Sequence, residues 1–362
     1  MATIVNTLIE GLTKQMVQTR LNSADAKPFL FGTHFPVKKV NGFTWKTLSN
    51  QLAKKNVAAD IQSDNSTTLR KRRPHFEMAM GDIPFIAISR EMKRDEIKAY
   101  QTARAFAPDA SAIDLVEYWG EDVDFCFNGV QSELEYIAWK LASNAGVLHF
   151  TKTTNATFAN EFDLDYGVDD DMKQKTGSNW GNAASADIIG DLVSLVNFAK
   201  AKGLNPKYGF INLNELYKIC SADQIIKKCA TVVQNVTGTG STPDLAQVNA
   251  MLAKQAWLNG IQLRVIDQTI TREFSDGSSE SGNPFENNRL ILSETPVLGS
   301  TQYDILAENN DCIIRAERSH TVVKKYGTCE PQSEVTIGQA DAVPVFDTAY
   351  RNLYVKTDAQ SW

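Results

Sequence analysis

The sequence predicts an α+β protein in which one long helix organises the fold and a compact second domain is inserted between two parts of the first. Three observations lead to this fold class. Residues 121–146 have the apolar spacing of one long amphipathic helix, residues 185–307 alternate between helix-like and strand-like segments, and residues 319–357 consist mostly of strand-like segments. The segments before residue 184 still need sheet partners, so we expect the β-rich tail to return to them.

The long helix is predicted from a stripe of apolar side chains. The stripe consists of Val123, Phe127, Val130, Leu134, Ile137 and Leu141. These positions follow one another at intervals of three or four residues, as one face of an α-helix requires. Glu121, Asp122 and Asp124 place negative charge in the first turn, where the helix dipole favours it. Gly146 offers a left-handed stop, so we expect a helix of about 35–40 Å whose stripe faces a sheet.

Composition and charge exclude several classes of protein. The 362 residues, of which 43% are hydrophobic, allow a sizeable core and about two or three domains. A net charge of −6 argues against a sequence-specific nucleic-acid binder, which usually carries a basic face. No apolar run reaches the roughly 18 residues of a membrane-spanning helix, and the N-terminus lacks the basic start and apolar block of a signal peptide. We therefore expect neither a membrane span nor a signal peptide.

The N-terminal region leaves two interpretations open. Ile4, Leu8 and Leu12 lie on one side of a short amphipathic helix predicted over residues 3–21. A loose segment with two prolines, residues 23–36, follows this helix. The helix is either an arm that packs on another surface or the first helix of the core.

Residues 37–92 predict a long two-stranded hairpin that projects from the body. Strand-like residues 40–50 and a second apolar strand, Ile83–Ile88, lie on either side of a basic run. The run consists of Arg70, Lys71, Arg72 and Arg73. A two-stranded hairpin is only marginally stable alone, so we expect it to lie on another surface, in particular on another subunit. The basic run fits either nucleic acid or an acidic patch of a neighbouring subunit, and we favour the subunit.

The remaining segments complete the body and the inserted domain. Helix is expected from residue 91 to Pro108, and a hairpin-like pair of strands over residues 147–167. In the inserted domain, Ser185 or Asp187 caps a helix that runs to Lys202. Further along the chain we expect a buried strand at 208–213, one or two helices at 214–234, a helix at 244–258 and a strand at 261–274.

No motif with recognisable catalytic or metal-binding chemistry emerges. The loop GTGSTP at 238–243 has no lysine after its glycines, so it is not a phosphate loop. The acidic loop at 163–171 lacks the glycine and glutamate positions of a calcium-binding EF-hand. The four histidines and five cysteines show no metal-ligand spacing, and we expect reduced thiols in a cytoplasmic protein. We therefore predict no catalytic residue, metal or cofactor; the arm, hairpin and long helix suit self-assembly better than catalysis.

Four local segments, together with the order of the elements, resemble one known family. GSNWGN at 177–182 resembles its glycine-tryptophan turn before a helix, and YGFINLNELYKI at 208–219 resembles its strand followed by a helix. NRLILSETPVLGSTQYD at 288–304 resembles its strand-then-glycine segment, and YGTCEPQSEVTIGQADAVPVF at 326–346 resembles its β-rich tail. The family is that of the major capsid (head) proteins of tailed bacteriophages, lambda-type, with the Hong Kong 97 fold.

The resemblance implies both an architecture and a function. The implied parts are an N-terminal arm (1–35), an extended β-hairpin loop (36–90), a peripheral domain (91–184 and 316–362) with a spine helix (121–146), and an axial domain (185–315). The implied protein is structural, not an enzyme, and its copies form the hexamers and pentamers of an icosahedral head around double-stranded DNA. Implied partners are further copies, DNA bound without sequence specificity, and portal, scaffold and decoration proteins. The implied location is the virion capsid, assembled in the host cytoplasm without a membrane.

Charged residues are the candidates for subunit contacts under this resemblance. The candidates are Arg70, Lys71, Arg72 and Arg73 on the hairpin, and the acidic residues Glu121, Asp122, Asp124, Asp169, Asp170 and Asp171. An acidic patch of one copy would attract the basic hairpin of the next. Two alternatives stay open: an encapsulin-like shell that holds protein cargo, and a two-domain soluble hydrolase with a cleft between its domains.

Overall fold

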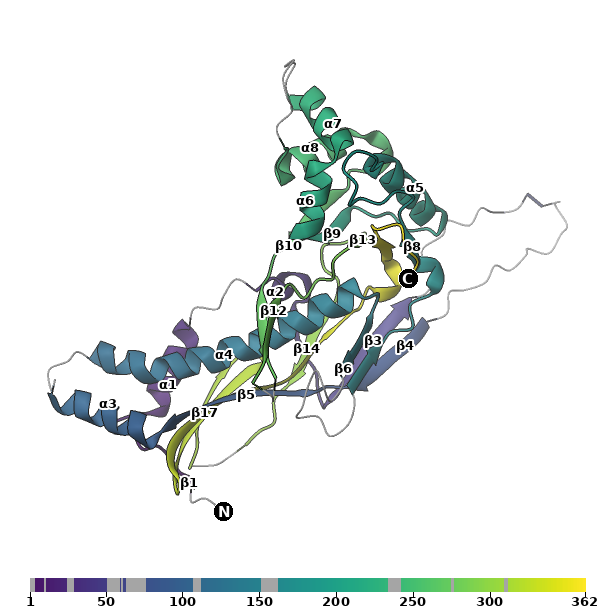
Figure 1. Cartoon of the computed structure of the whole chain (residues 1–362). Helices are drawn as coiled ribbons and strands as arrows, with labels where there is room; N and C mark the ends of the chain where they lie inside the picture. Colours follow the sequence, from purple (N-terminus) through teal and green to yellow (C-terminus); the bar gives the residue numbers. More distant parts are fainter. Residues whose placement is uncertain are drawn as a thin grey trace.

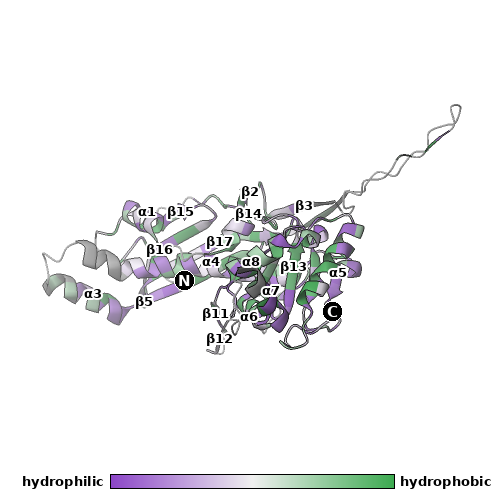
Figure 2. Cartoon of the chain, turned by 90° about the horizontal axis from the view of Figure 1, so that it is seen from above, coloured by the Kyte–Doolittle hydropathy of each residue, from purple (hydrophilic) through white to green (hydrophobic). Residues whose placement is uncertain are grey.

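A long helix lying across a seven-stranded sheet forms one part of the molecule, and a second sheet covered by helices forms the other (Figure 1). The computed structural model describes residues 4–9, 11–24, 29–50, 59, 61–62, 76–106, 112–150, 162–233, 242–274, 277–308 and 312–362. Seen from above, helices α3 (Arg94–Phe106) and α5 (Ile188–Ala201) lie toward opposite ends of an elongated body (Figure 2). The α+β fold class predicted from the sequence is confirmed.

The first sheet gathers strands from both termini and from the middle of the chain. Its members are β1 (Ile4–Val5), β2 (Val37–Lys39), β5 (Phe85–Lys93), β14 (Ser300–Asp304), β15 (Ile314–Arg318), β16 (Thr321–Cys329) and β17 (Gln332–Val345). The order runs β1-β16-β17-β14-β2, with β15 paired to β16 and β5 paired to β17. Strand β17 therefore lies at the centre, and strands of the predicted tail do return to earlier segments of the chain.

The long helix α4 (Ala112–Ser143) lies over β17 and β5. All six side chains of the predicted apolar stripe are buried, and none is more than 5% exposed. The predicted start at Glu121 is wrong, because the helix begins nine residues earlier. A single glycine, here Gly120, costs a helix only about 1 kcal/mol and does not end it. The helix ends at a left-handed stop formed by Ala145 and Gly146, with φ of 53° and 78°.

Two glycines let α4 rest directly on the first sheet. A Cβ added at Gly338 of β17 would overlap the backbone carbonyl oxygen of Cys126 in α4. A Cβ added at Gly129 of α4 would lie 2.7 Å from the Ile88 side chain of β5. Helix and sheet therefore approach each other closely enough at Gly338 that only a hydrogen fits between them.

The helix predicted over residues 3–21 is wrong in its first half. The chain starts with β1 at the edge of the first sheet, and helix α1 covers Lys14–Ser23. Gly11, at a φ of 82°, lies between them. The Thr13 side chain then caps α1 by accepting a hydrogen bond from the Met16 N–H at 3.3 Å. Since α1 packs against β15 and α4, this part of the N-terminal region belongs to the core.

The hairpin is present as β3 (Thr44–Asn50) and β4 (Phe76–Asp82), which pair antiparallel along their whole length. The strand predicted over Ile83–Ile88 divides differently, because Pro84 lies between the end of β4 and the start of β5 and lacks the N–H that a strand ladder needs. Beyond Pro84, β5 joins the first sheet. The basic run Arg70–Arg73 lies outside the described residues.

The second sheet and its helices form the region where an inserted domain was predicted. The sheet order is β10 (Gln262–Ile266), β9 (Tyr208–Asn212), β13 (Arg289–Ser293), β18 (Leu353–Lys356) and β8 (Lys173–Lys175). The helices that accompany it are α5, α6 (Leu213–Ser221), α7 (Asp223–Val233) and α8 (Leu245–Lys254). Of the two predicted caps for α5, Asp187 is the one used, since its side chain accepts a hydrogen bond from the Gly190 N–H at 3.0 Å.

The second sheet separates two hydrophobic cores. Phe210 and Tyr354 point into the core beneath α4, whereas Ile211 and Leu353, their neighbours in the chain, point into the core covered by the helices. This alternation is the two-residue period of a strand. Because both faces of one sheet are buried in this way, the two parts of the molecule pack together through it.

Several strands cross the predicted domain boundaries. Residues 316–362 were expected in the first sheet, but β18 pairs with β13 and β8 in the second. Strand β14, from the range 185–315, lies in the first sheet, and β15 of the same sheet crosses the predicted boundary between residues 315 and 316. The chain thus passes between the sheets more often than predicted, since strand-like patterning does not specify the pairing partner. The boundaries themselves stay a prediction.

Two short hairpins lie beside the main sheets. Strands β6 (Val147–Phe150) and β7 (Phe162–Asp165) form the hairpin-like pair predicted after the long helix. Strands β11 (Ile270–Glu273) and β12 (Ser279–Gly282) form the other. The strand predicted over 261–274 is therefore divided between β10 and β11. Single turns of 3₁₀ helix occur at Asp170–Met172, Ala256–Leu258 and Ala349–Arg351.

Candidate functional site

The acidic residues predicted at the start of the long helix lie beside arginines of the same chain. Asp124 forms an ion pair with Arg20 of α1. Asp122 and Glu121 each lie 3.4 Å from the Arg90 guanidinium of β5. Burial raises the pKa of Asp122, while the positive charges of Lys325 and Arg90 oppose that shift. Asp122 and Asp124 therefore tie elements of one chain together, and the Glu121 side chain, 76% exposed, is the member of the group with most access to a partner.

The second predicted acidic group lies in the loop that leads into β8, beside the second sheet. Asp170 forms an ion pair with Lys173 at 3.0 Å, and Asp171 forms one with Lys202 at 2.5 Å. The hydrogen bond from Lys202 lowers the pKa of the exposed Asp171 carboxyl. Asp169 is exposed. The two acidic groups thus lie on different parts of the molecule, and a subunit-contact role for either one stays a prediction.

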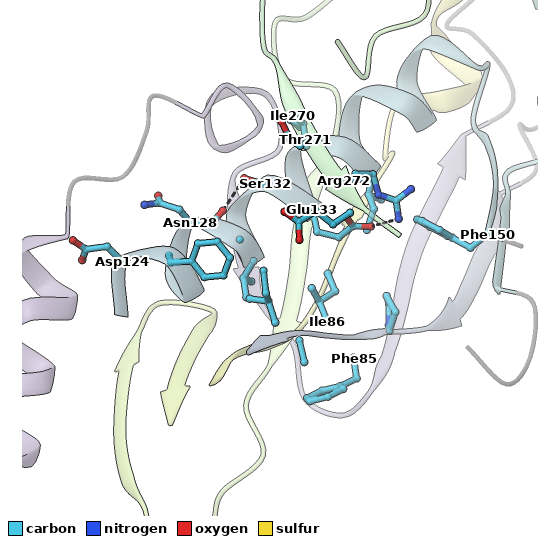
Figure 3. A pocket seen from close by; sticks show the side chains of 18 of the residues that line it. Phe85, Ile86, Asp124, Asn128, Ser132, Glu133, Phe150, Ile270, Thr271 and Arg272 are labelled. Carbon is cyan, nitrogen blue, oxygen red and sulfur yellow. Dashed lines mark hydrogen bonds and ion pairs between the residues drawn. The ribbon is translucent and has the colours of Figure 1, made fainter. Parts of the chain in front are cut away.

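The surface also has a groove of about 1060 Å³ that the sequence did not reveal. Strand β5, helix α4 and strand β11 line it, as Figure 3 shows. Its apolar lining includes Ile86 and Ile88 of β5, Val130 and Ile137 of α4, and Phe150 of β6. The lining comes from separate segments, and β11 lies more than 100 residues along the chain from the others, so no local sequence signal could have indicated the groove.

Charged side chains occupy the ends of this groove. Toward one end, the Arg272 guanidinium of β11 lies 3.5 Å from a Glu133 carboxylate oxygen and 4.4 Å from the centre of the Tyr136 ring. Burial raises the pKa of Glu133, and the charge of Arg272 opposes that shift. Arg90, which is not part of the lining, lies over the ring of the lining residue Phe125 at 5.0 Å. The groove therefore combines an apolar floor with a polar rim, the pattern of a surface that binds protein.

Exposed apolar side chains flank the groove. Phe85 of β5 is 56% exposed and Phe125 of α4 is 44% exposed, and both line it. Asn128, also in the lining, has a buried side-chain oxygen with no hydrogen-bond partner among the described residues. Large apolar side chains gathered with a buried, unsatisfied acceptor indicate a surface that is incomplete in the single chain.

His320 lies at a buried junction between the N-terminal region and the first sheet. Its ring approaches those of Phe31 and Tyr303 edge-on, and Nε2 lies 3.1 Å from the side-chain oxygen of Gln131. Burial lowers the pKa of His320 from 6.5 to about 4. The neutral ring is therefore the form that the folded protein accommodates.

This shift predicts a loss of stability in acid. The contribution of His320 is fully present above pH 6.5, where the unfolded chain also leaves the ring neutral, and is lost as the pH falls from 6.5 to about 4. The expected loss is about 3 kcal/mol in the free energy of unfolding. Urea unfolding at pH 7 and pH 4 should show that His320→Gln loses about 3 kcal/mol less than the unchanged protein. Equal pH dependence of the two proteins would contradict the prediction.

Two kinds of site are not seen in the described part of the chain. None of the helices there is long and apolar enough to cross a bilayer. Within the same residues, histidine, cysteine and carboxylate side chains form no group of three or more that could hold a metal ion. All five cysteines are free thiols, three of them buried. The surface features described above are accordingly the candidates for function.

Comparisons with known proteins identify the fold. No protein-family model matches the chain, and no curated protein sequence matches it. Among solved structures, a phage-related protein from Bordetella bronchiseptica is similar over 99% of both chains, with a TM-score of 0.55 and 13% identity. A protein of an Escherichia coli prophage, described as a capsid protein, is similar over 98% of this chain and 99% of its own, with a TM-score of 0.57 and 13% identity.

These similarities run from end to end of the chain and define its fold. The chain has the fold of phage capsid proteins, with a long helix on one sheet and a second sheet covered by helices. It is the Hong Kong 97-type major capsid fold that the sequence segments resemble. At 13% identity the comparison establishes the fold, and the roles of individual residues rest on this chain's own geometry.

Proposed function

We propose that this protein is the major shell subunit of a bacteriophage head. Many copies assemble into hexamers and pentamers of an icosahedral capsid that encloses double-stranded DNA. The observation that carries the proposal is the similarity of the fold to that of a prophage capsid protein over 98% of this chain. That fold supports a structural role over a catalytic one.

The geometry of the chain supports a mechanical role. Helix α4 rests on the first sheet through Gly338, which makes a stiff plate. The hairpin β3–β4 carries Met78 and Met80 with 56% and 57% of their surfaces exposed, on the same face of β4. Exposed apolar side chains on a two-stranded hairpin favour contact with a further copy, because such a hairpin has little core of its own. Identical contacts repeated around a closed shell add up, so each can be weak.

Partners and location follow from the same proposal. The subunits bind one another, and portal, scaffold and decoration proteins are the further proteins that a head requires. The net charge of −6 suits a shell whose inner surface holds DNA without sequence specificity, since a strongly basic surface would grip phosphates tightly. The assembled protein belongs in the virion capsid, after assembly in the host cytoplasm.

The test is whether the purified chain forms closed particles. We expect size-exclusion chromatography and negative-stain electron microscopy of the recombinant protein to show shells with hexameric and pentameric units, alone or with a co-expressed scaffold. Particles from phage-producing cells should contain nuclease-resistant double-stranded DNA. A chain that remains a small monomer under all these conditions would overturn the proposal, and particles filled with protein cargo in place of DNA would replace it with a cargo shell.

A further inference from the structure

We propose that Asn41 is a site of self-modification, at which the Gly42 nitrogen attacks the side-chain amide of Asn41 and the Asp304 carboxylate takes the proton from that nitrogen. The product is a five-membered succinimide ring, which water opens to aspartate or isoaspartate. Three features of the described chain support this reaction: an exposed Asn–Gly pair, a carboxylate bonded to the glycine N–H, and two further Asn–Gly pairs without that carboxylate. The reaction takes place within one folded chain, so its test does not depend on the formation of shells.

The reacting pair lies in the exposed turn between strands β2 and β3. Both Asn41 and Gly42 are exposed. Gly42 has a φ of 95°, and a Cβ added to it would meet nothing within 4 Å. Because glycine carries no side chain, nothing on its own backbone hinders the approach of the Asn41 amide to the Gly42 nitrogen. The two groups that must react are therefore neighbours in an open part of the surface.

Asp304, at the end of β14, is placed to act as the base. Its Oδ2 accepts a hydrogen bond from the Gly42 N–H at 2.8 Å. Its Oδ1 accepts one from the Ile305 N–H at 2.8 Å, which fixes the orientation of the carboxylate. A general base must lie within hydrogen-bond reach of the proton that it removes, and Asp304 meets this condition before any movement of the chain.

The reaction balances with one water molecule and no other reagent. The Gly42 nitrogen bonds to Cγ of Asn41, and its proton passes through Asp304 to the side-chain nitrogen, which leaves as ammonia. Water then breaks one of the two C–N bonds of the ring. Breaking the bond to Cγ gives aspartate, whereas breaking the bond to the backbone carbonyl carbon gives isoaspartate, in which the chain continues through the side chain.

Two other Asn–Gly pairs provide a comparison within the same chain. Asn128–Gly129 lies inside helix α4, where the backbone is held in the helical ladder. Asn259–Gly260 lies in a turn, and the Asn259 side-chain nitrogen donates hydrogen bonds to Asn205 Oδ1 at 2.6 Å and to the Pro206 carbonyl oxygen at 3.1 Å. Among the described residues, no carboxylate accepts a hydrogen bond from either glycine nitrogen. The fold thus favours reaction at Asn41 over two sites with the same pair of residues.

The modification would alter the attachment of the β3–β4 hairpin. Strand β2 pairs with β14 beside the start of β3 (Figure 2), and the Gln302 side chain of β14 bonds the Lys46 N–H at 3.1 Å and the Lys46 carbonyl oxygen at 2.9 Å. The contact of Gly42 with Asp304 is the neighbouring attachment. Both products add a carboxylate near Asp304 and its register partner Asp341, whose pKa is already raised by burial and by the charge of Asp304. Isoaspartate also adds one carbon to the backbone, so this attachment weakens as the protein ages.

Peptide mass spectrometry of the full chain, incubated near neutral pH, measures the reaction at all three sites. Labelling with an isoaspartate methyltransferase identifies the isoaspartate product. We expect Asn41 to convert at least about tenfold faster than Asn128 and Asn259. Asp304→Asn keeps an oxygen acceptor in the same place but removes the base, so it should slow conversion of Asn41 about tenfold and leave Asn259 unchanged. In concentrated urea, where the chain is unfolded, Asp304→Asn should have no effect on either site.

A second variant separates the base from the local charge. Asp341→Asn makes the same change one strand away, without a contact to Gly42, and should leave the rate at Asn41 unchanged. Circular dichroism of both variants establishes that the chain still folds. If Asp304 only restrained the Gly42 nitrogen, Asp304→Asn would leave conversion unchanged or make it faster, and that result would overturn the assignment of the base. An Asn41 that stays intact while Asn259 converts would overturn the site itself.

Discussion

Glu135→Leu is expected to lower the free energy of unfolding by about 4 kcal/mol, because it leaves three N–H donors, two buried and one half-buried, without an acceptor. The Glu135 carboxylate accepts hydrogen bonds from the backbone N–H of Leu30 at 3.2 Å, from that of Phe31 at 2.7 Å and from the Trp139 indole at 2.6 Å. The side chain of Glu135 is completely buried in α4. Burial raises the pKa of this carboxyl, and the three hydrogen bonds oppose that shift.

The position of these donors explains why the loss should be large. Leu30 and Phe31 stand at the start of the short helix α2 (Phe31–His34), which has no side-chain cap of its own. Glu135 therefore serves as the cap from a different element and fixes the N-terminal region onto α4. Each buried donor left unsatisfied costs about 1–3 kcal/mol, and a leucine of similar volume cannot replace the carboxylate.

Urea unfolding followed by circular dichroism measures the effect. Glu121→Leu provides the matched control, since the same change is made in the same helix at a side chain that is 76% exposed. We expect that variant to stay within about 0.5 kcal/mol of the unchanged protein. A loss of less than about 1 kcal/mol for Glu135→Leu would mean that α2 is held by its apolar contacts and that the carboxylate contributes little.

The fold could be predicted from the sequence where burial follows a local period. The apolar stripe of α4 repeats every three or four residues over 19 positions, and each of its members is buried as expected. Asp187 and Asp244 cap helices α5 and α8, at helix starts that the sequence predicted. Such caps can be predicted because a capping side chain bonds to residues only a few positions along the chain. Local chemistry of this kind is visible in a sequence because its partners are close along the chain.

The sequence failed where the structure depends on distant partners. The helix predicted over residues 3–21 loses its first half because Ile4 and Val5 pair with Thr328 and Gly327, more than 300 residues away. The same limitation hides the partner of β18, whose pattern fits either sheet.

The candidate site follows the same rule. The predicted acids are only in part available at the surface. Asp122 and Asp124 form ion pairs with Arg90 and Arg20 of their own chain, and no spacing in the sequence indicates these pairs. The groove was missed altogether, because β5, α4 and β11 meet there only after the chain has folded.

Replacing Gly338 with alanine is expected to destabilise the fold by about 2–3 kcal/mol, although alanine is normally tolerated better than glycine in an extended strand. The added Cβ would overlap the carbonyl oxygen of Cys126, and backbone on both sides leaves no flexible side chain to move away. Either α4 rises from the sheet or β17 moves, and both changes open the packed layer beneath the apolar stripe. The stiffness of the plate should fall together with its stability.

The thiol of Cys126 reports which of these occurs. It is fully buried, donates to the Thr336 carbonyl oxygen at 3.4 Å, and has its pKa raised by burial to about 11, so it should react very slowly with a thiol reagent. Cys312 and Cys329 are exposed and should react at once in every variant. We expect Gly338→Ala to add a third reacting thiol under native conditions if the helix rises.

A glycine elsewhere separates this effect from strand propensity. Gly282 of β12 has open space where a Cβ would stand, so Gly282→Ala should change stability by less than about 0.5 kcal/mol and leave Cys126 protected. If Gly338→Ala behaved like Gly282→Ala in both measurements, the contact between helix and sheet would be looser than the backbone geometry requires. The proposed shell function needs α4 and the first sheet to act as one plate. A looser contact would mean that the rigidity of the chain comes instead from the packing of the second sheet between its two cores.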